Sequence, residues 1–414
     1  MKLYLIIVLL SAFVSLSLGQ TLPSASPEKI KTFGSSLEKY RNKNQKNKKQ
    51  QPDSQENRKV EESNDGEVIR VKSDLVVNDV LVTDQNRNVI TGLKKDDFIV
   101  TENSVPQTIE IFSPGENASV PRSIVLVIDC VAPQVPYIRK SIEAAKLLVD
   151  KLNPNDKMAI VTVDVKLRMD FTTDKTLLKK TLDSLETKDI KIWGGLEFDA
   201  LLAVLNEMFA AEDRRPIIIF QGDGTEIIWL QTDKDAPYRV SNSVRENSGM
   251  RYTGKMRNFG FSEVKEAVAS SRATIYSIIP GIRFLGFSKE ERLARAKTSF
   301  KNTYRALGIQ EKYLPVLMRK YQGRDAEVLA AGQTAMFRVA ELSGGNAGFI
   351  EKPEDAESIY SDIFTVIKNR YVIGYYPTNE ARDGKRRNVK IDVRNHPEYI
   401  VTGRKAYFAP ETGE

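Results

Sequence analysis

Residues 124–129 read Ile-Val-Leu-Val-Ile-Asp, an unbroken apolar run that ends in a carboxylate. Such a run is typical of a strand that is buried on both faces of a parallel sheet. Residues 217–224, Ile-Ile-Ile-Phe-Gln-Gly-Asp-Gly, repeat the pattern and place Asp223 just after a second strand. Because open parallel sheets bind ligands at the carboxyl ends of their strands, we expect Asp129 and Asp223 at one edge, where they could share a divalent cation.

The segments around these two strands alternate between strand-like and helix-like patterns. Helical spacing is expected over residues 138–152, 177–185, 197–210, 263–270, 328–342 and 353–368, and further strands over residues 158–163, 167–171, 273–279 and 347–350. This alternation predicts an α/β domain over residues 121–370, with a mainly parallel, doubly wound sheet and helices on both faces. A highly charged stretch at about residues 283–330 interrupts the rhythm and is expected to be an inserted helical pair or lid.

Strand-like segments flank the α/β region on both sides. Residues 67–115 alternate β-branched with polar residues and predict a small β-sandwich-like module. Residues 371–410 carry three further β segments, 371–376, 388–393 and 399–407, which are expected to form a C-terminal extension.

The first 19 residues have the features of a signal peptide. Lys2 precedes an apolar core over residues 3–14, and the small residues Ser17 and Gly19 fit the positions before a cleavage site. The rest of the chain has no apolar run of the roughly 20 residues that span a bilayer. We therefore expect an exported protein, periplasmic or secreted, whose mature chain has no transmembrane segment.

Residues 20–66 are rich in polar residues and poor in large apolar ones, which predicts a disordered linker. The linker holds much of the chain's net charge of +7, because residues 39–49 contain six basic residues and no acidic one. This basic stretch could contact an anionic polymer. Because the excess charge is concentrated there, specific nucleic-acid binding is not expected.

Cysteine and histidine each occur once, as Cys130 and His396. A single cysteine excludes an intramolecular disulfide, and the pair nearly excludes zinc sites of His and Cys and catalysis by Ser-His-Asp or Cys-His groups. Gly194-Gly195 lacks the Lys-Ser/Thr ending of a phosphate-binding loop. The residue types therefore favour a protein that is not an enzyme.

The chain resembles the von Willebrand factor type A domain and, more narrowly, the exported proteins related to it that are abundant in acidobacteria. The resemblance runs from about Val68 to Pro410. It includes three further stretches, Asp97-Phe98 with Val105-Pro106-Gln107, Tyr371-Val372-Ile373-Gly374-Tyr375-Tyr376-Pro377, and Gly403-Arg404-Lys405-Ala406-Tyr407. Each piece is weak alone, but the combination is specific to the family.

The resemblance implies a degenerate form of the family's metal-ion-dependent adhesion site. That site holds Mg²⁺ with an Asp-x-Ser-x-Ser loop, a threonine on a glycine-rich loop, and a later aspartate. Asp129 and Asp223 match the aspartates, whereas Val131 and Pro133 replace the serines and the threonine falls at or beside Gly195. Without the three hydroxyls, we expect at most weak Mg²⁺ binding by Asp129 and Asp223.

We therefore expect non-catalytic, adhesion-type binding of an unidentified protein or cell-surface ligand. The expected binding face consists of residues at the sheet edge and on its loops, namely Asp129, Trp193, Gly194, Gly195, Asp223 and Trp229. Ile227 and Ile228, on the long 224–261 loop, are expected to join this interface, and Asp199 to face solvent or cap its helix. Two alternatives are an envelope structural or assembly subunit that contacts anionic polymer through its linker, and a metal-dependent hydrolase.

Overall fold

The computed structural model describes residues 32–40, 75–114, 120–131, 134–188, 195–209, 215–233, 256–319 and 324–410. The expected signal peptide, most of the basic linker, Pro133, Trp193 and Gly194 lie outside these residues. Among the described residues, no helix combines the length and apolarity that a membrane crossing requires.

A six-stranded sheet forms the centre of the α/β domain. Its strands, in spatial order, are β10 (Ala347–Ile350), β9 (Thr274–Pro280), β8 (Arg215–Gln221), β5 (Arg122–Ile128), β6 (Lys157–Thr162) and β7 (Lys166–Thr172). All neighbours are parallel except β6 and β7, which form a hairpin at the edge. The expected doubly wound α/β fold is therefore confirmed.

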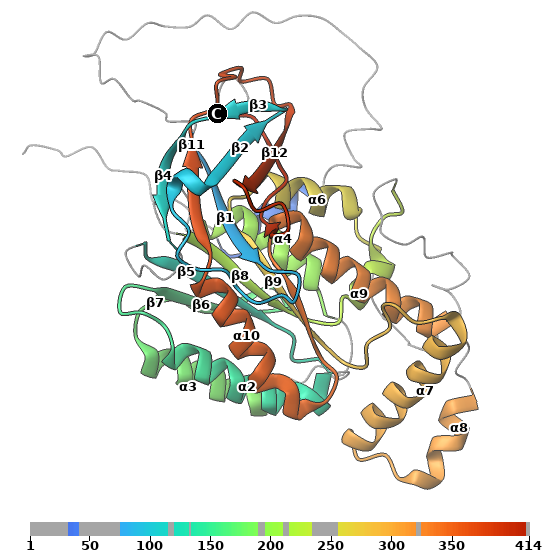
Figure 1. The fold of residues 1–414 in the computed structure, drawn as a ribbon. Coiled ribbons are helices and arrows are strands. Elements are labelled where there is room, and N and C mark those ends of the chain that lie inside the picture. The colour runs from blue at the N-terminus through green and yellow to red at the C-terminus, as the bar shows by residue number, and fades with distance from the viewer. Residues whose placement is uncertain are drawn as a thin grey trace, which may run out of the picture. The chain divides into compact units, whose positions relative to one another are not determined.

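Helices cover both faces of this sheet (Figure 1). One face carries α2 (Val135–Asp150), α3 (Lys175–Lys188) and α10 (Ala356–Lys368), and the other carries α4 (Glu197–Glu207), α6 (Phe261–Ser270) and α9 (Arg324–Ser343). Along β5 the period of two sends Val125 and Val127 to one core and Ile124, Leu126 and Ile128 to the other. This two-sided burial explains the unbroken apolar run.

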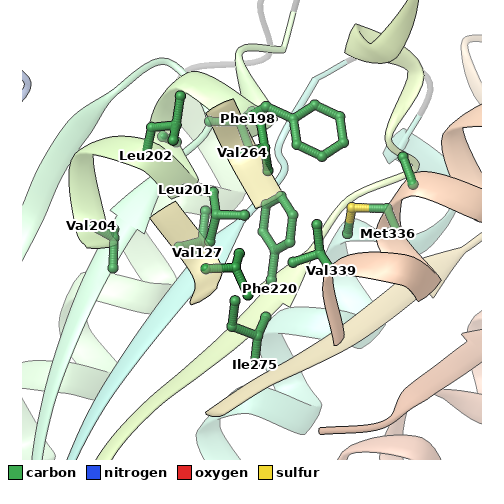
Figure 2. Packing of buried hydrophobic residues seen from close by; sticks show 14 of the residues in the cluster. Val127, Phe198, Leu201, Leu202, Val204, Phe220, Val264, Ile275, Met336 and Val339 are labelled. Atoms are coloured by element: carbon green, nitrogen blue, oxygen red, sulfur yellow. The ribbon is translucent and has the colours of Figure 1, made fainter. Parts of the chain in front are cut away.

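The core beneath α4, α6 and α9 is built around aromatic and branched side chains (Figure 2). Phe198 of α4 packs edge-on against Phe220 of β8, with ring centroids 6.2 Å apart. Val264 of α6 and Met336 of α9 belong to the same buried cluster. The start of α4 is thereby fixed over the end of β8, where the acidic residues lie.

Strands that precede and follow the α/β domain in the sequence interleave in a pair of four-stranded sheets. Their strands are β1 (Val76–Thr83), β2 (Phe98–Glu102), β3 (Val105–Gln107), β4 (Ile109–Ser113), β11 (Tyr371–Tyr375), β12 (Arg386–Val393), β13 (Ile400–Thr402) and β14 (Ala406–Phe408). The orders are β13-β1-β11-β4 and β14-β12-β2-β3. The strands at residues 76–113 therefore pair with those at residues 371–408, whereas a separate module over 67–115 and a C-terminal extension over 371–410 were expected. The strand expected over 399–407 is divided at Gly403 and contributes to both sheets.

Part of the expected linker is ordered. Residues 35–37 form a short 3-10 helix, and the carboxylate of Glu207 accepts hydrogen bonds from the backbone N–H groups of Gly34 and Ser36, both at 2.8 Å. Leu37 and Tyr40 are buried against the main core. The prediction of disorder is therefore wrong for residues 33–40. Burial of Leu37 and Tyr40, together with the hydrogen bonds to the Glu207 carboxylate, offsets the entropic cost of ordering this segment.

The expected helical insertion is present between β9 and α9. It contains α7 (Lys289–Ala306) and α8 (Leu314–Arg319) and projects beside α9 (Figure 1). A small cluster of Phe284, Ala296, Ala326 and Ala330 joins α7 to α9. The insertion is therefore packed at its base on the carboxyl side of β9.

We predict that Tyr371→Ala lowers the free energy of unfolding by about 3–5 kcal/mol, since a large aromatic side chain is lost from a packed core. Tyr371 is 1% exposed in the core between the two small sheets, and its hydroxyl donates to Ile90 O and accepts from Leu93 N. Tyr376→Ala is the control, because Tyr376 is 52% exposed. Urea unfolding measures the free energy of unfolding of both variants. Equal losses for Tyr371→Ala and Tyr376→Ala would contradict a core shared by the two small sheets.

Candidate metal centre

Three carboxylates meet at the carboxyl edge of the sheet. Asp129 follows β5, Asp223 follows β8, and Glu197 is the first residue of α4. One carboxylate oxygen of each lies within 4.8 Å of the other two. All three are buried, with exposed fractions of 0% for Asp129, 1% for Glu197 and 8% for Asp223.

The two aspartates are held by the loops that follow their strands. Asp129 Oδ1 accepts a hydrogen bond from the backbone N–H of Val131 at 2.9 Å, and Asp223 Oδ1 accepts one from Thr225 at 2.9 Å. Asp223 Oδ2 accepts from the side-chain amide of Gln134 at 3.0 Å. Asp129 Oδ2 is buried and has no hydrogen-bond partner, so one acceptor in the cluster is left unsatisfied.

The start of α4 and the loop after β8 hold each other by reciprocal hydrogen bonds. Glu197 Oε1 accepts from Gly224 N, and Glu197 Oε2 accepts from Glu226 N, both at 3.1 Å. In return, Glu226 Oε2 accepts from Phe198 N at 2.6 Å and satisfies an N–H group at the helix start. Glu197 therefore positions the loop that carries Asp223 while adding its own charge to the cluster.

A second group of charges lies behind this loop. Arg257 Nε donates to Asp199 Oδ2 at 2.5 Å and to Glu226 Oε1 at 2.9 Å. Asp199 is thus buried in an ion pair, and the prediction that it faces solvent or caps its own helix is wrong. Its partner lies 58 residues away along the chain, so local sequence could not show the contact.

Two glycines allow α9 to approach the Asp223 loop closely. Gly224 has a φ of +71°, and a Cβ there would lie 2.3 Å from the carbonyl oxygen of Gly332. A Cβ on Gly332 would lie 2.5 Å from the carbonyl oxygen of Asp223. Only glycine fits at either position, and the contact fixes the loop from the side of α9.

The electrostatics of the cluster favour a bound cation. Burial, followed by the negative charge of the neighbouring carboxylate, raises the pKa of Asp129 well above its ordinary value; burial and the charges of Asp223 and Asp129 do the same to the pKa of Glu197. In the described part of the chain, no Lys or Arg forms an ion pair with Asp129, Glu197 or Asp223. Buried charges need such compensation.

The donor set fits a hard divalent cation. It consists of oxygen atoms from three carboxylates, including the unsatisfied Asp129 Oδ2. Mg²⁺ and Ca²⁺ prefer oxygen ligands, whereas zinc sites usually include nitrogen or sulfur. Asp129, Glu197 and Asp223 would therefore hold the ion, and water or a ligand would complete its coordination.

The other described residues that were predicted for the binding face are mostly buried or partly buried near the sheet edge. Gly195 lies beside Glu197, whose Cδ would be 3.5 Å from a Cβ on that glycine. Trp229 is half-buried against the main core, and Ile227 and Ile228 are buried within it. The expectation that the two isoleucines contribute to an interface is therefore wrong, because they anchor a 3-10 helix, η4 (Thr225–Trp229).

Glu197 is the candidate metal ligand that the sequence did not predict. The family pattern places a hydroxyl at or beside Gly195, and this chain has a carboxylate two residues later instead. An acidic residue at the start of an apolar helix, just after the Gly194-Gly195 loop, was the available signal.

No known protein-family model and no curated protein matches the chain. Among solved structures, the conserved hypothetical protein BatB from Bacteroides thetaiotaomicron is similar, with 13% identity and a TM-score of 0.34 over 60% of this chain and 99% of BatB. The vWF domain of the type V pili tip protein Mfa5 from Porphyromonas gingivalis has 13% identity and a TM-score of 0.36 over 61% of this chain and 96% of that domain.

A third similar structure is proximal thread matrix protein 1 from the mussel byssus, solved with a zinc-occupied metal-ion-dependent adhesion site. The identity is 14% and the TM-score 0.31, over 60% of this chain and 48% of that protein, so the chain spans about half its length. The mostly parallel sheet with one antiparallel edge strand, and the acidic residues after β5 and β8, agree with the sequence resemblance. In fold, residues 121–370 resemble a von Willebrand factor type A domain, and they are called the type A-like domain below.

We predict that Arg257→Ala lowers the unfolding free energy of the type A-like domain by about 3–5 kcal/mol, because it leaves buried carboxylates without their cation. The Glu226 side chain is 0% exposed and that of Asp199 10% exposed. The control is Arg338→Ala. Arg338 forms an ion pair with Glu341, and the two side chains are 50% and 41% exposed. This pair should contribute only about 0–1 kcal/mol. Chemical denaturation compares the two; a small loss for Arg257→Ala would contradict the pairing.

Proposed function

We propose that the chain is an exported, non-catalytic binding protein that takes its ligand at the carboxyl edge of the type A-like sheet through a divalent cation. Asp129, Glu197 and Asp223 would hold the ion, and the ligand would complete its coordination or pack beside it. The supporting observation is the buried cluster of three carboxylates, which has an unsatisfied oxygen and no basic ion-pair partner in the described part of the chain. The ligand would be a protein or a cell-surface molecule.

Glu197 should strengthen the binding of a metal ion at this site. With two aspartates alone, Mg²⁺ would rely on waters for most of its coordination, and binding should be weak. A third carboxylate, fixed by Gly224 N and Glu226 N, adds a preorganised ligand that needs little reorganisation. The cation is therefore an integral part of the proposed site.

The proposal excludes a catalytic role for the single histidine. His396 lies in the turn after β12, where its ring stacks on Tyr399 at 4.5 Å and its Nδ1 contacts Glu398 at 2.9 Å. It belongs to the paired small sheets and not to the acidic edge. Binding without turnover is consistent with this placement.

We predict that metal-stripped protein binds Mg²⁺ with a single-site isotherm and melts at a higher temperature when loaded, because the ion binds the native state. Glu197→Gln should weaken Mg²⁺ binding at least about tenfold, a loss of about 1.4 kcal/mol of binding free energy. Glu207→Gln is the matched control: it removes the same charge from the other end of α4, where Glu207 caps Gly34 and Ser36. Calorimetric titration measures Mg²⁺ binding by the wild type and both variants, and thermal unfolding with and without Mg²⁺ measures the melting temperature.

Absence of Mg²⁺, Ca²⁺ and Mn²⁺ binding by the wild-type chain would overturn the metal-dependent part of the proposal. Its binding role is tested by affinity capture of envelope and secreted components. A specific ligand should be captured by wild type and Glu207→Gln, and lost both with EDTA and in Glu197→Gln. Capture that is unaffected by both EDTA and Glu197→Gln would contradict this site as the binding face.

A further inference from the structure

The helical insertion is attached at its base, and its far end projects. Phe284 and Ala296 pack with two alanines of α9 in a buried cluster, and Arg295 pairs with Glu351 at 2.8 Å. Beyond this attachment, the last turns of α7, the turn that follows and α8 extend away from the central sheet (Figure 1). Residues 301–319 are called the insertion tip below.

The insertion tip is a closed helical turn. Gly308 ends α7 with a φ of +77°, and its N–H donates to Arg305 O at 2.9 Å. The Arg305 side chain pairs with Glu311 at 2.5 Å across the turn. Leu314, the first residue of α8, is 3% exposed and anchors the returning chain. The tip therefore has a defined inner side, and the fold leaves the side chains on its outer side exposed.

Three apolar side chains lie on the outer side of the tip. Leu307 is 38% exposed, Tyr313 53% and Val316 60%. Tyr313 and Val316 are three residues apart and are the two most exposed large apolar residues of the described part of the chain. Single exposed apolar residues are ordinary on protein surfaces. Three within ten residues at the end of a projecting element indicate a surface that a partner covers.

The region of the tip is strongly basic. Residues 297–319 contain five basic residues and one acidic residue. The acidic residue, Glu311, is already held in the ion pair across the turn. Lys301 is exposed on α7, and Lys312 is exposed on the turn, where its Nζ lies 5.0 Å from the centroid of the Tyr313 ring. Positive charge therefore lies directly beside the exposed apolar side chains.

An anionic lipid surface suits this combination of features. A projecting apolar tip needs a partner that can deform around it, as the interface of a bilayer does. Tyrosine favours the headgroup level of a bilayer, and basic side chains are attracted to an anionic leaflet over about one screening length. Lys301 precedes Leu307 by about 9 Å along the axis of α7. Its charge would therefore act on a surface that the apolar side chains touch.

We propose that the insertion tip docks on an anionic lipid surface. Leu307, Tyr313 and Val316 enter the boundary between headgroups and acyl chains, and Lys301 and Lys312 contact the anionic headgroups. The contact is peripheral, because α8 has six residues and a spanning helix needs about 20. This surface is additional to the carboxyl edge of the sheet, and the docking does not require the metal.

Vesicle flotation of the full chain tests the docking. One set of vesicles contains phosphatidylcholine alone, and the other contains an equal mixture of phosphatidylcholine and phosphatidylglycerol. The chain should bind the anionic vesicles at least about tenfold more tightly, and added salt should remove most of the difference. No binding to either set, or equal binding to both, would overturn the proposal.

Val316→Asp should weaken binding to the anionic vesicles at least about tenfold, because a charged group replaces an apolar group that enters the interface. Val105→Asp is the matched control, since Val105 is 51% exposed on β3 and receives the same charge. Equal losses in the two variants would contradict docking through the tip.

The basic residues are tested by removing two charges at a time. Lys301→Gln combined with Lys312→Gln should weaken binding to the anionic vesicles about tenfold. Lys94→Gln combined with Lys95→Gln is the control, because it removes the same charge from exposed positions just before β2. Binding that is unchanged in both the lysine variant and Val316→Asp would assign the contact to another basic part of the chain and overturn the proposal.

A polarity-sensitive fluorophore distinguishes lipid from an acidic protein as the partner. Its emission should shift to shorter wavelength on anionic vesicles when it is attached to Val316→Cys, and should not shift on Val105→Cys. The single native cysteine, Cys130, is buried. A response to poly-L-glutamate without a response to vesicles would assign the tip to an acidic protein and overturn the proposal. Val316→Asp should bind Mg²⁺ as the wild type does, so docking and the metal site can fail separately.

Discussion

The reciprocal hydrogen bonds between the start of α4 and the loop after β8 determine the geometry of the whole carboxyl edge. Glu197 satisfies two N–H groups of that loop, and Glu226 satisfies one at the start of α4. Neither carboxylate can leave without exposing a buried donor, which costs about 1–3 kcal/mol per unsatisfied group. The exchange brings two negative charges into the interior, and the surrounding structure must accommodate both.

The two charges are accommodated differently. Glu226 shares Arg257 with Asp199, so a protein cation offsets that side of the loop. On the other side, Glu197 joins Asp129 and Asp223 without a basic residue among its described ion-pair partners. The fold thus pairs the carboxylates of Glu226 and Asp199 with an arginine and leaves the other three together without one. This uncompensated negative charge is the physical basis of the proposed site.

Much of the α/β domain could be predicted because its signals are local. The period of two along β5 and the amphipathic spacing of α2 and α10 reflect burial on a sheet face, and Asp129 and Asp223 could be located because each ends a buried strand. Long-range contacts could not be read in this way. Asp199 meets Arg257 far along the chain, residues 33–40 dock on Glu207, and β1 lies between β13 and β11 from the opposite end of the sequence. Glu197 was missed for a related reason, because its position beside two aspartates depends on how α4 enters the sheet edge.

Buried acidic residues at the amino ends of the central strands are paired with arginine, in contrast to the three carboxylates of the candidate metal centre. At the amino ends of the strands, Arg122 pairs with Asp156, and Arg215 pairs with Asp79 of β1 at 2.9 Å. The interleaved small sheets are attached at this end, where every acidic residue in these contacts has an arginine. The insertion follows β9 and therefore emerges at the carboxyl end, beside the unpaired carboxylates. Because Asp156 and Asp79 at the attached end each have an arginine, the unpaired carboxylates of Asp129, Glu197 and Asp223 are a feature of their own cluster and not a general property of this core.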